Sequence, residues 1–197
     1  MRSVSSSILL PVSIAAAFRV ITDLNTIIRL SPFFTLKNIE PPTDGDAQKG
    51  DRCRLTIEYY ENKMIETYGV EIDRLEIDKL ISYNIENGIV RNILYELEPA
   101  GEGVQLTQTF ELDSENETII KGTQDELHAW LRSVGKYLKL SESNSPLKRV
   151  QKSFMDSIWL RLSISERNIA IIMIKISVLE LVLLLVLVLI WNIGMNR

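Results

Sequence analysis

Residues 52–59 read RCRLTIEY, and the alternation in this stretch decides the fold class. Side chains that can be buried, at Cys53, Leu55, Ile57 and Tyr59, alternate with charged or polar ones. Successive side chains of a β-strand point to opposite faces of the sheet. The stretch therefore predicts a strand with one buried and one solvated face.

Further strands are predicted on both sides of this one. The same period recurs later in the chain, at 67–72, 80–85, 90–97 and 104–112. Turn sequences such as ENG at 86–88 and PAGEG at 99–103 separate these stretches, and connections this short predict an antiparallel meander. A loop at 41–50, with two prolines and two glycines, separates the meander from an earlier strand near 34–39.

Two short helices and one long helix complete the predicted domain. Residues 3–11 have the composition of a first strand, and Ser13 is a good N-cap for a helix over 14–23. A second helix over 23–31 stops before Pro32, because the residue before a proline is disfavoured in the helical region. The apolar residues of the last helix, over 117–140, recur at helical spacing: Ile120, Leu127, Leu131, Val134 and Leu138.

The N-terminal part of the chain also resembles a known family. Leu10-Pro11-Val12-Ser13 leads into IAAAFRVITD at 14–23, and Leu30-Ser31-Pro32 closes the second helix. With the order of elements, this pattern resembles the START-like (SRPBCC) superfamily of polyketide cyclases, dehydrases and lipid transporters, over residues 1–140. The resemblance implies an α+β helix-grip fold, in which a curved antiparallel sheet wraps around the long last helix. It also implies an apolar cavity for lipids, quinones, steroids or polyketides.

We expect a cavity of this kind to be lined by apolar side chains with few polar groups. The candidates are Ile57, Tyr59, Ile81, Tyr83, Tyr95, Leu106, Gln108 and Phe110 from the sheet, with Leu127, Leu131, Val134 and Leu138 from the last helix. Gln108 is the most informative of them, because it lies in phase with apolar residues and needs a buried hydrogen-bond partner. The alternative is an ordinary solid core, which has the same spacing.

Charge separates the chain into two parts. Residues 1–140 hold 15 basic and 22 acidic side chains, whereas residues 141–197 hold 7 and 4. An acidic main domain argues against a nucleic-acid partner, since binding to the phosphate backbone needs clustered Lys and Arg. Cys53 is the single cysteine, so one chain forms neither an internal disulfide nor a thiolate zinc site. No cofactor is expected.

A membrane anchor is predicted at residues 169–193, which read IAIIMIKISVLELVLLLVLVLIWNI. A helix of this length spans roughly 37 Å, enough to cross a hydrocarbon core of about 30 Å. Lys175 and Glu180 lie toward its start and Trp191 near its end, at the expected membrane interfaces. The alternative for this segment is an amphipathic or oligomerising helix that does not span. A signal peptide over the N-terminal apolar stretch 8–17 would instead place the domain outside the cell.

The segment before the anchor is basic. After a linker at 141–146, residues 147–168 predict an amphipathic helix whose apolar residues include Val150 and Phe154. This helix either lies at the membrane interface or packs on the domain or a partner. The expected interface residues are Lys148, Arg149, Lys152, Trp159 and Arg161. The excess of positive charge before the anchor places the N-terminal domain in the cytoplasm.

Catalytic chemistry has few candidates in the sequence. His128 is the single histidine, and no partner for it can be named. The acidic residues between 66 and 78 alternate with apolar ones, which favours a solvated strand face over a metal site. Cys53 lies in phase with apolar positions and is expected to be buried and inert. No catalytic or metal-binding residue is therefore assigned.

Three functions remain open at this point. The leading hypothesis is a non-enzymatic, single-pass membrane protein whose cytoplasmic domain binds or transfers a lipid or other hydrophobic molecule. The second is a cyclase- or dehydratase-like enzyme on a lipophilic substrate, with His128 or Tyr83 assisting proton transfer. The third is a membrane-anchored interaction protein with a filled core and a membrane-protein partner.

Overall fold

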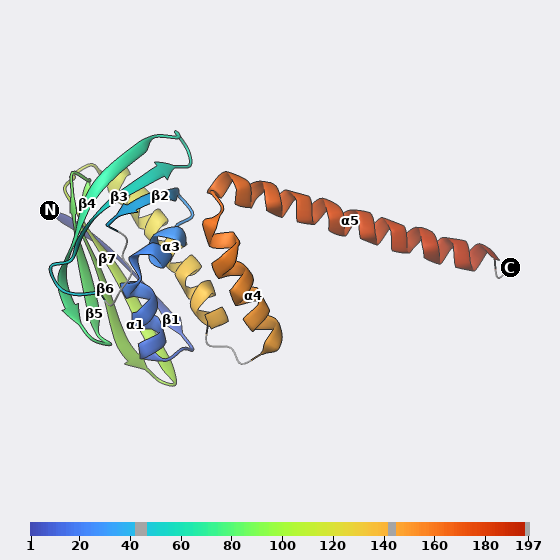
Figure 1. Ribbon diagram of the computed structural model, residues 1–197, viewed down its shortest axis with the longest axis horizontal. Helices are drawn as coiled ribbons and strands as arrows, with labels where there is room; N and C mark the ends of the chain where they lie inside the picture. The colour runs from blue at the N-terminus through green and yellow to red at the C-terminus, as the bar shows by residue number, and fades with distance from the viewer. Residues whose placement is uncertain (42–46, 142–144, 196–197) are drawn as a thin grey trace. The chain divides into compact units, whose positions relative to one another are not determined.

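Seven strands form one antiparallel sheet in the part of the chain that the computed structural model describes, residues 1–41, 47–141 and 145–195 (Figure 1). Their order across the sheet is β1-β7-β6-β5-β4-β3-β2. The strands are β1 (Arg2–Leu10), β2 (Phe34–Glu40), β3 (Arg52–Tyr59), β4 (Ile65–Glu76), β5 (Leu80–Glu86), β6 (Val90–Ala100) and β7 (Gly103–Leu112). Every predicted strand is present, and the meander from β2 to β7 is confirmed.

The first strand joins the sheet beside the last one. β1 pairs with β7 along its whole length, from Arg2↔Leu112 to Leu10↔Val104. Register shifts interrupt the pairing within β2, β4 and β6. Such irregularities bend a strand and increase its local twist, which favours a curved sheet.

Three helices belong to this α+β core: α1 (Ile14–Thr22), α2 (Leu24–Arg29) and α3 (Glu117–Ser141). The Ser13 hydroxyl caps α1 by accepting the backbone N–H of Ala16. Asp23 does not continue the first helix, as the sequence predicted, but ends it and caps α2 by accepting the N–H of Thr26. Figure 1 shows α1 and α3 on the concave side of the sheet.

The long helix α3 lies mainly against β1 rather than across the whole sheet. Gly135 permits the close approach, because a Cβ atom there would lie 2.8 Å from the Ile8 Cδ1 atom. The predicted apolar face of α3 is buried here: Leu127, Leu131, Val134 and Leu138. Because α3 packs on the edge strand β1, α2 and Trp130 face the strands farther along the sheet.

The segment after α3 differs from the single helix predicted over 147–168. The structure has α4 (Pro146–Ser157), a 3₁₀ turn at Trp159–Arg161, and α5 (Ile164–Met195). A capping box explains the new helix start, because Ser163 and Glu166 exchange side-chain to backbone hydrogen bonds. Residues 142–144 of the predicted linker lie outside the described residues.

Compact structure extends past the predicted boundary at residue 140. The chain forms two units, Met1–Arg161 and Leu162–Arg197, so α4 and the 3₁₀ turn belong with the sheet. The Tyr137 hydroxyl of α3 donates to Asp156 of α4 at 2.8 Å, and Lys152 donates to the same carboxylate at 2.7 Å. Leu160 of the turn is buried, and its carbonyl accepts from Arg29 of α2.

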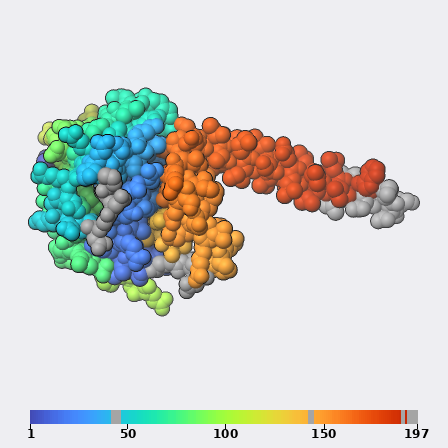
Figure 2. Space-filling view, in the orientation of Figure 1, coloured from blue at the N-terminus to red at the C-terminus, as the bar shows by residue number. Residues whose placement is uncertain are grey.

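The apolar stripe of α4 is exposed. No residue of α4, the orange segment near residue 150 in Figure 2, is buried. Its exposed residues include Leu147, Val150 and Phe154. Among the predicted interface residues, Lys148, Arg149 and Arg161 are exposed, and Lys152 and Trp159 are half-buried. The Tyr137–Asp156 hydrogen bond and the partly buried Met155, which packs against the core, therefore hold α4 to the rest of the first unit.

The second unit is the helix α5. Its stretch Ile164–Val188 is long enough to cross a membrane. An 18-residue segment within that stretch has a mean hydropathy of 2.8, and none of this segment is buried. Lys175, Glu180 and Trp191 are exposed on it. Length and composition make α5 a candidate span, and alone they are weak evidence for one.

Candidate functional site

A cavity of about 490 Å³ lies between α2, α3 and the middle strands of the sheet. Its walls come from every strand from β2 to β7, from two helices and from the turn after β5. The lining residues are Leu24, Ile27, Ile28, Phe33, Phe34, Leu55, Ile57, Tyr59, Asn62, Glu66, Tyr68, Val70, Tyr83, Ile85, Asn87, Gly88, Ile89, Val90, Ile93, Tyr95, Phe110, Thr123, Glu126 and Trp130.

Five of the twelve candidates from the sequence line this cavity: Ile57, Tyr59, Tyr83, Tyr95 and Phe110. The other seven are buried but lie outside its lining: Ile81, Leu106, Gln108, Leu127, Leu131, Val134 and Leu138. The four helical residues among them share the buried face of α3, the helix that packs mainly on β1. The α3 residues that line the cavity instead are Thr123, Glu126 and Trp130, on the neighbouring face of the helix.

Several lining residues were missed by sequence reasoning although a signal for them exists. Thr123, Glu126 and Trp130 recur at helical spacing beside the predicted stripe of α3. Glu66 and Tyr68 lie in phase with Val70 on β4. The apolar residues of α2 carried no such signal, because a helix this short has too few turns for its buried face to be assigned to a cavity.

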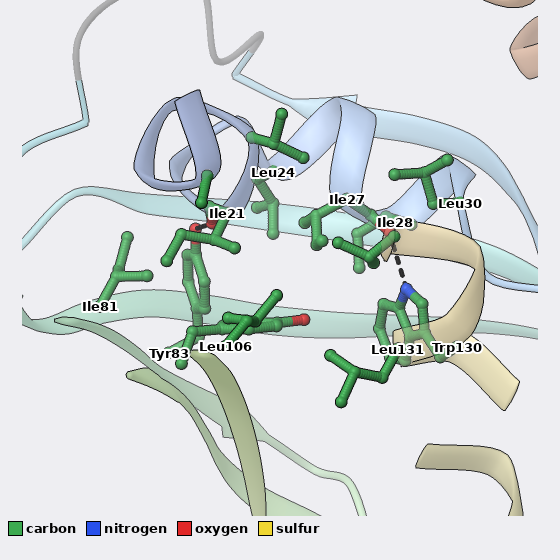
Figure 3. Packing of buried hydrophobic residues seen from close by; sticks show 14 of the residues in the cluster. Ile21, Leu24, Ile27, Ile28, Leu30, Ile81, Tyr83, Leu106, Trp130 and Leu131 are labelled. Atoms are coloured by element: carbon green, nitrogen blue, oxygen red, sulfur yellow. Dashed lines mark hydrogen bonds between the residues drawn. The ribbon is translucent and has the colours of Figure 1, made fainter. Parts of the chain in front are cut away.

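Hydrogen bonds to helix backbone hold two aromatic walls in place. The Tyr83 hydroxyl donates to the Ile21 carbonyl at 2.8 Å, and the Trp130 indole N–H donates to the Ile27 carbonyl at 3.0 Å (Figure 3). Trp130 also meets the rings of Phe34 and Phe110 edge to face. Each ring thus buries its apolar body while its polar atom is satisfied, which fixes the wall's shape.

A buried polar pair joins the cavity to the core behind it. Gln108 is 0% exposed and donates from Nε2 to the Tyr95 hydroxyl at 2.8 Å. This bond is the partner that the sequence required for Gln108, although its Oε1 atom has none among the described residues. Burial raises the pKa of Tyr95, so its hydroxyl keeps its proton. Because the Tyr95 oxygen accepts a hydrogen bond from Gln108 Nε2, the Tyr95 proton is not used in that bond.

The polar end of the cavity carries a chain of three side chains. Tyr68 donates its proton to Glu66, and Tyr59 lies 2.8 Å from the Tyr68 oxygen. Burial raises the pKa of both tyrosines, and the Glu66 carboxylate adds to the increase at each. Because the Tyr68 proton is committed to Glu66, the remaining hydrogen bond runs from Tyr59 to Tyr68.

Glu126 is the second carboxylate at this end. Burial raises its pKa, and the nearby charge of Glu61 raises it further. The same end holds the exposed lining residues Asn62, Asn87 and Ile89, so it forms the entrance. The buried apolar lining residues of α2, β3, β4 and β7 form the interior.

The residues that the sequence offered for chemistry lie elsewhere or are already engaged. His128 is exposed, accepts or donates at Ser6 across 2.7 Å, and does not line the cavity. Cys53 is half-buried, and burial raises its pKa. In the acidic stretch of β4, Glu71 and Glu76 pair with Arg52 and Lys79, and the described residues contain no cluster with metal-ligand geometry.

Solved structures share this architecture. The Aha1 dimer from Colwellia psychrerythraea matches with a TM-score of 0.53 and 12% identity, over 73% of this chain and 100% of that one. The AHSA1-like protein from Aeromonas hydrophila matches with a TM-score of 0.54 and 14% identity, over 71% and 94%. Ara h 8.0201 matches with a TM-score of 0.52 and 17% identity, over 70% and 97%.

The first unit has the helix-grip fold. The element order in the sequence predicted it, and these structures confirm it. No family model and no curated protein matches the chain. At identities this low the likeness concerns the fold alone.

We predict that the Tyr95–Gln108 pair stabilises the fold only as a pair. Tyr95→Phe leaves the buried Gln108 amide without its partner and should lower the free energy of unfolding by about 1–3 kcal/mol. Adding Gln108→Met, which is similar in length and apolar, should recover most of that loss. Urea unfolding of the full chain in lipid nanodiscs measures both, and a double variant less stable than Tyr95→Phe alone would contradict the account.

Proposed function

We propose that this chain binds or transfers a hydrophobic small molecule and is tethered to a membrane by α5. The observation that carries the proposal is the cavity of about 490 Å³ enclosed between the sheet and its helices. This volume lies in the range typical of small-molecule sites, roughly 300–1,000 Å³. A buried methylene contributes about 0.8 kcal/mol, so an apolar ligand that fills such a space can be retained.

The arrangement of the lining supports ligand binding over a filled core. Apolar side chains form the interior, and the polar groups gather at the entrance and at Tyr95. Sites of this kind use their apolar walls for affinity and a few polar groups for orientation. Fixed rings such as Tyr83 and Trp130 reduce the cost of ordering the site when a ligand enters.

The tether is supported by the composition of the second unit. α5 is long and apolar, and the exposed stripe of α4 precedes it in the chain. The positive charge before α5 favours a cytoplasmic domain. Confinement to the bilayer surface raises the effective concentration of the domain near lipophilic ligands.

A bulky side chain at the entrance should block uptake. Thr123→Phe adds a ring to the lining, whereas Gly122→Phe adds the same ring next to it, where nothing lies within 4 Å of the new Cβ. We expect Thr123→Phe to weaken binding of N-phenylnaphthylamine by about tenfold and Gly122→Phe to leave it within about twofold. Energy transfer from Trp130 reports binding in a Trp159→Phe, Trp191→Phe background, with the full chain in a non-ionic amphipathic polymer. Equal effects of the two phenylalanines would contradict uptake through this entrance.

Cysteine labelling tests the tether. On a Cys53→Ser background, a membrane-impermeant maleimide added to intact expression-host cells should label Trp191→Cys and spare Ser153→Cys. The two positions lie on opposite sides of the proposed span, so the reagent reaches one of them. Lysed cells, in which both should react, provide the control. Labelling of both positions, or of neither, in intact cells would contradict a span with a cytoplasmic domain.

A further inference from the structure

The charged residues that line the cavity are acidic. Glu66 and Glu126 are the charged residues among the described lining, and Glu61 lies close enough to raise the pKa of Glu126. The cation of the neighbouring β3–β4 connection, Lys63, lies over the Tyr60 ring and pairs with Glu58. A ligand head group at the entrance therefore meets negative charge without a compensating lysine, arginine or histidine in the lining.

The hydrogen bonds at the entrance also have one direction. Tyr68 gives its proton to Glu66, and Tyr59 gives its proton to Tyr68. Both hydroxyl protons are thereby used within the protein. What Tyr59 and Glu66 offer to a ligand is unshared electron pairs, so these two side chains accept hydrogen bonds and do not donate them. The donors among the side chains at this end include the uncharged amides of Asn62 and Asn87.

The inner wall has the opposite polarity. Tyr95 is 1% exposed, lines the cavity, and receives a hydrogen bond from Gln108. Its own proton has no acceptor among the residues that the structure describes. The buried hydroxyl of a lining residue that lacks an acceptor is a group that a bound molecule can satisfy, independently of the carboxylates at the entrance.

We propose that the cavity selects an apolar molecule whose head group donates hydrogen bonds, best met by an aliphatic ammonium, and discriminates against carboxylate head groups. This inference rests on the proposed ligand-binding function. An ammonium supplies several donors and a positive charge, and both match the acceptors of Glu66, Glu126 and Tyr59. A carboxylate would lie beside the like charges of Glu66 and Glu126 in a partly desolvated site, with no cation in the described lining to offset them.

Three ligands with one tail separate the effect of the head group from that of the chain. Dodecylamine, dodecanol and dodecanoate displace N-phenylnaphthylamine from the full chain in a non-ionic amphipathic polymer at neutral pH. We expect dodecylamine to bind at least about tenfold more tightly than dodecanoate, with dodecanol between them. Dodecanoate binding as tightly as dodecylamine would overturn the head-group inference and leave the proposed function standing.

Variants assign the preference to the entrance. Glu66→Gln with Glu126→Gln removes both charges while each amide oxygen can still accept a hydrogen bond, and we expect it to reduce the preference for amine over carboxylate to within about threefold. Glu98→Gln is the matched control, because Glu98 is exposed on β6 and lies outside the lining. An unchanged preference in the double variant would overturn the inference. Failure of all three ligands to displace the probe would instead remove the proposed function beneath it.

Discussion

The packing of α3 against β1 determines which part of the concave sheet surface other elements must cover. Gly135 lets the helix approach the Ile8 and Leu10 side chains, and β1 in turn pairs with β7 along its length. The helix is therefore held at one edge of the sheet. The concave surface of the middle strands must be covered by something else. α1 contacts β5 and β6, and α2 with the Trp130 side of α3 lines the space that remains. A short helix over a curved sheet leaves space, and that space is the cavity.

The polar groups of the cavity follow from this arrangement. Tyr83 and Trp130 anchor their polar atoms on the backbone at the ends of α1 and α2, so those helices and the cavity walls are linked. Tyr59, Tyr68 and Glu66 come from adjacent antiparallel strands, whose pairing brings their side chains together at one end. The interior is thus apolar because α2 and the sheet cover it, and the entrance is polar because strand ends and α3 meet water there.

Sequence patterns were sufficient for the seven strands and for α1 to α3, and insufficient for the partner of each face. Alternation identified every strand, and Ile57, Tyr83, Tyr95 and Phe110, four of the candidates that it offered, line the cavity in the structure. The stripe of Leu127 and Leu131 showed which side of α3 is buried. Helical spacing alone does not identify the strand on which that side packs. The capping box at Ser163 and Glu166 was readable in the sequence, and it divides the predicted helix over 147–168. The pairing of Tyr59 with Tyr68 depends on strand register, which a single sequence does not fix.

The central claim is that the helix-grip unit encloses a space that a hydrophobic molecule occupies. Native mass spectrometry of the full chain, released from a non-ionic amphipathic polymer after purification from expression-host membranes, tests it most directly. The account predicts a stoichiometric added mass that organic extraction removes and identifies as an apolar compound. A chain that shows only its own mass, and retains no added long-chain alcohol or amine, would contradict it.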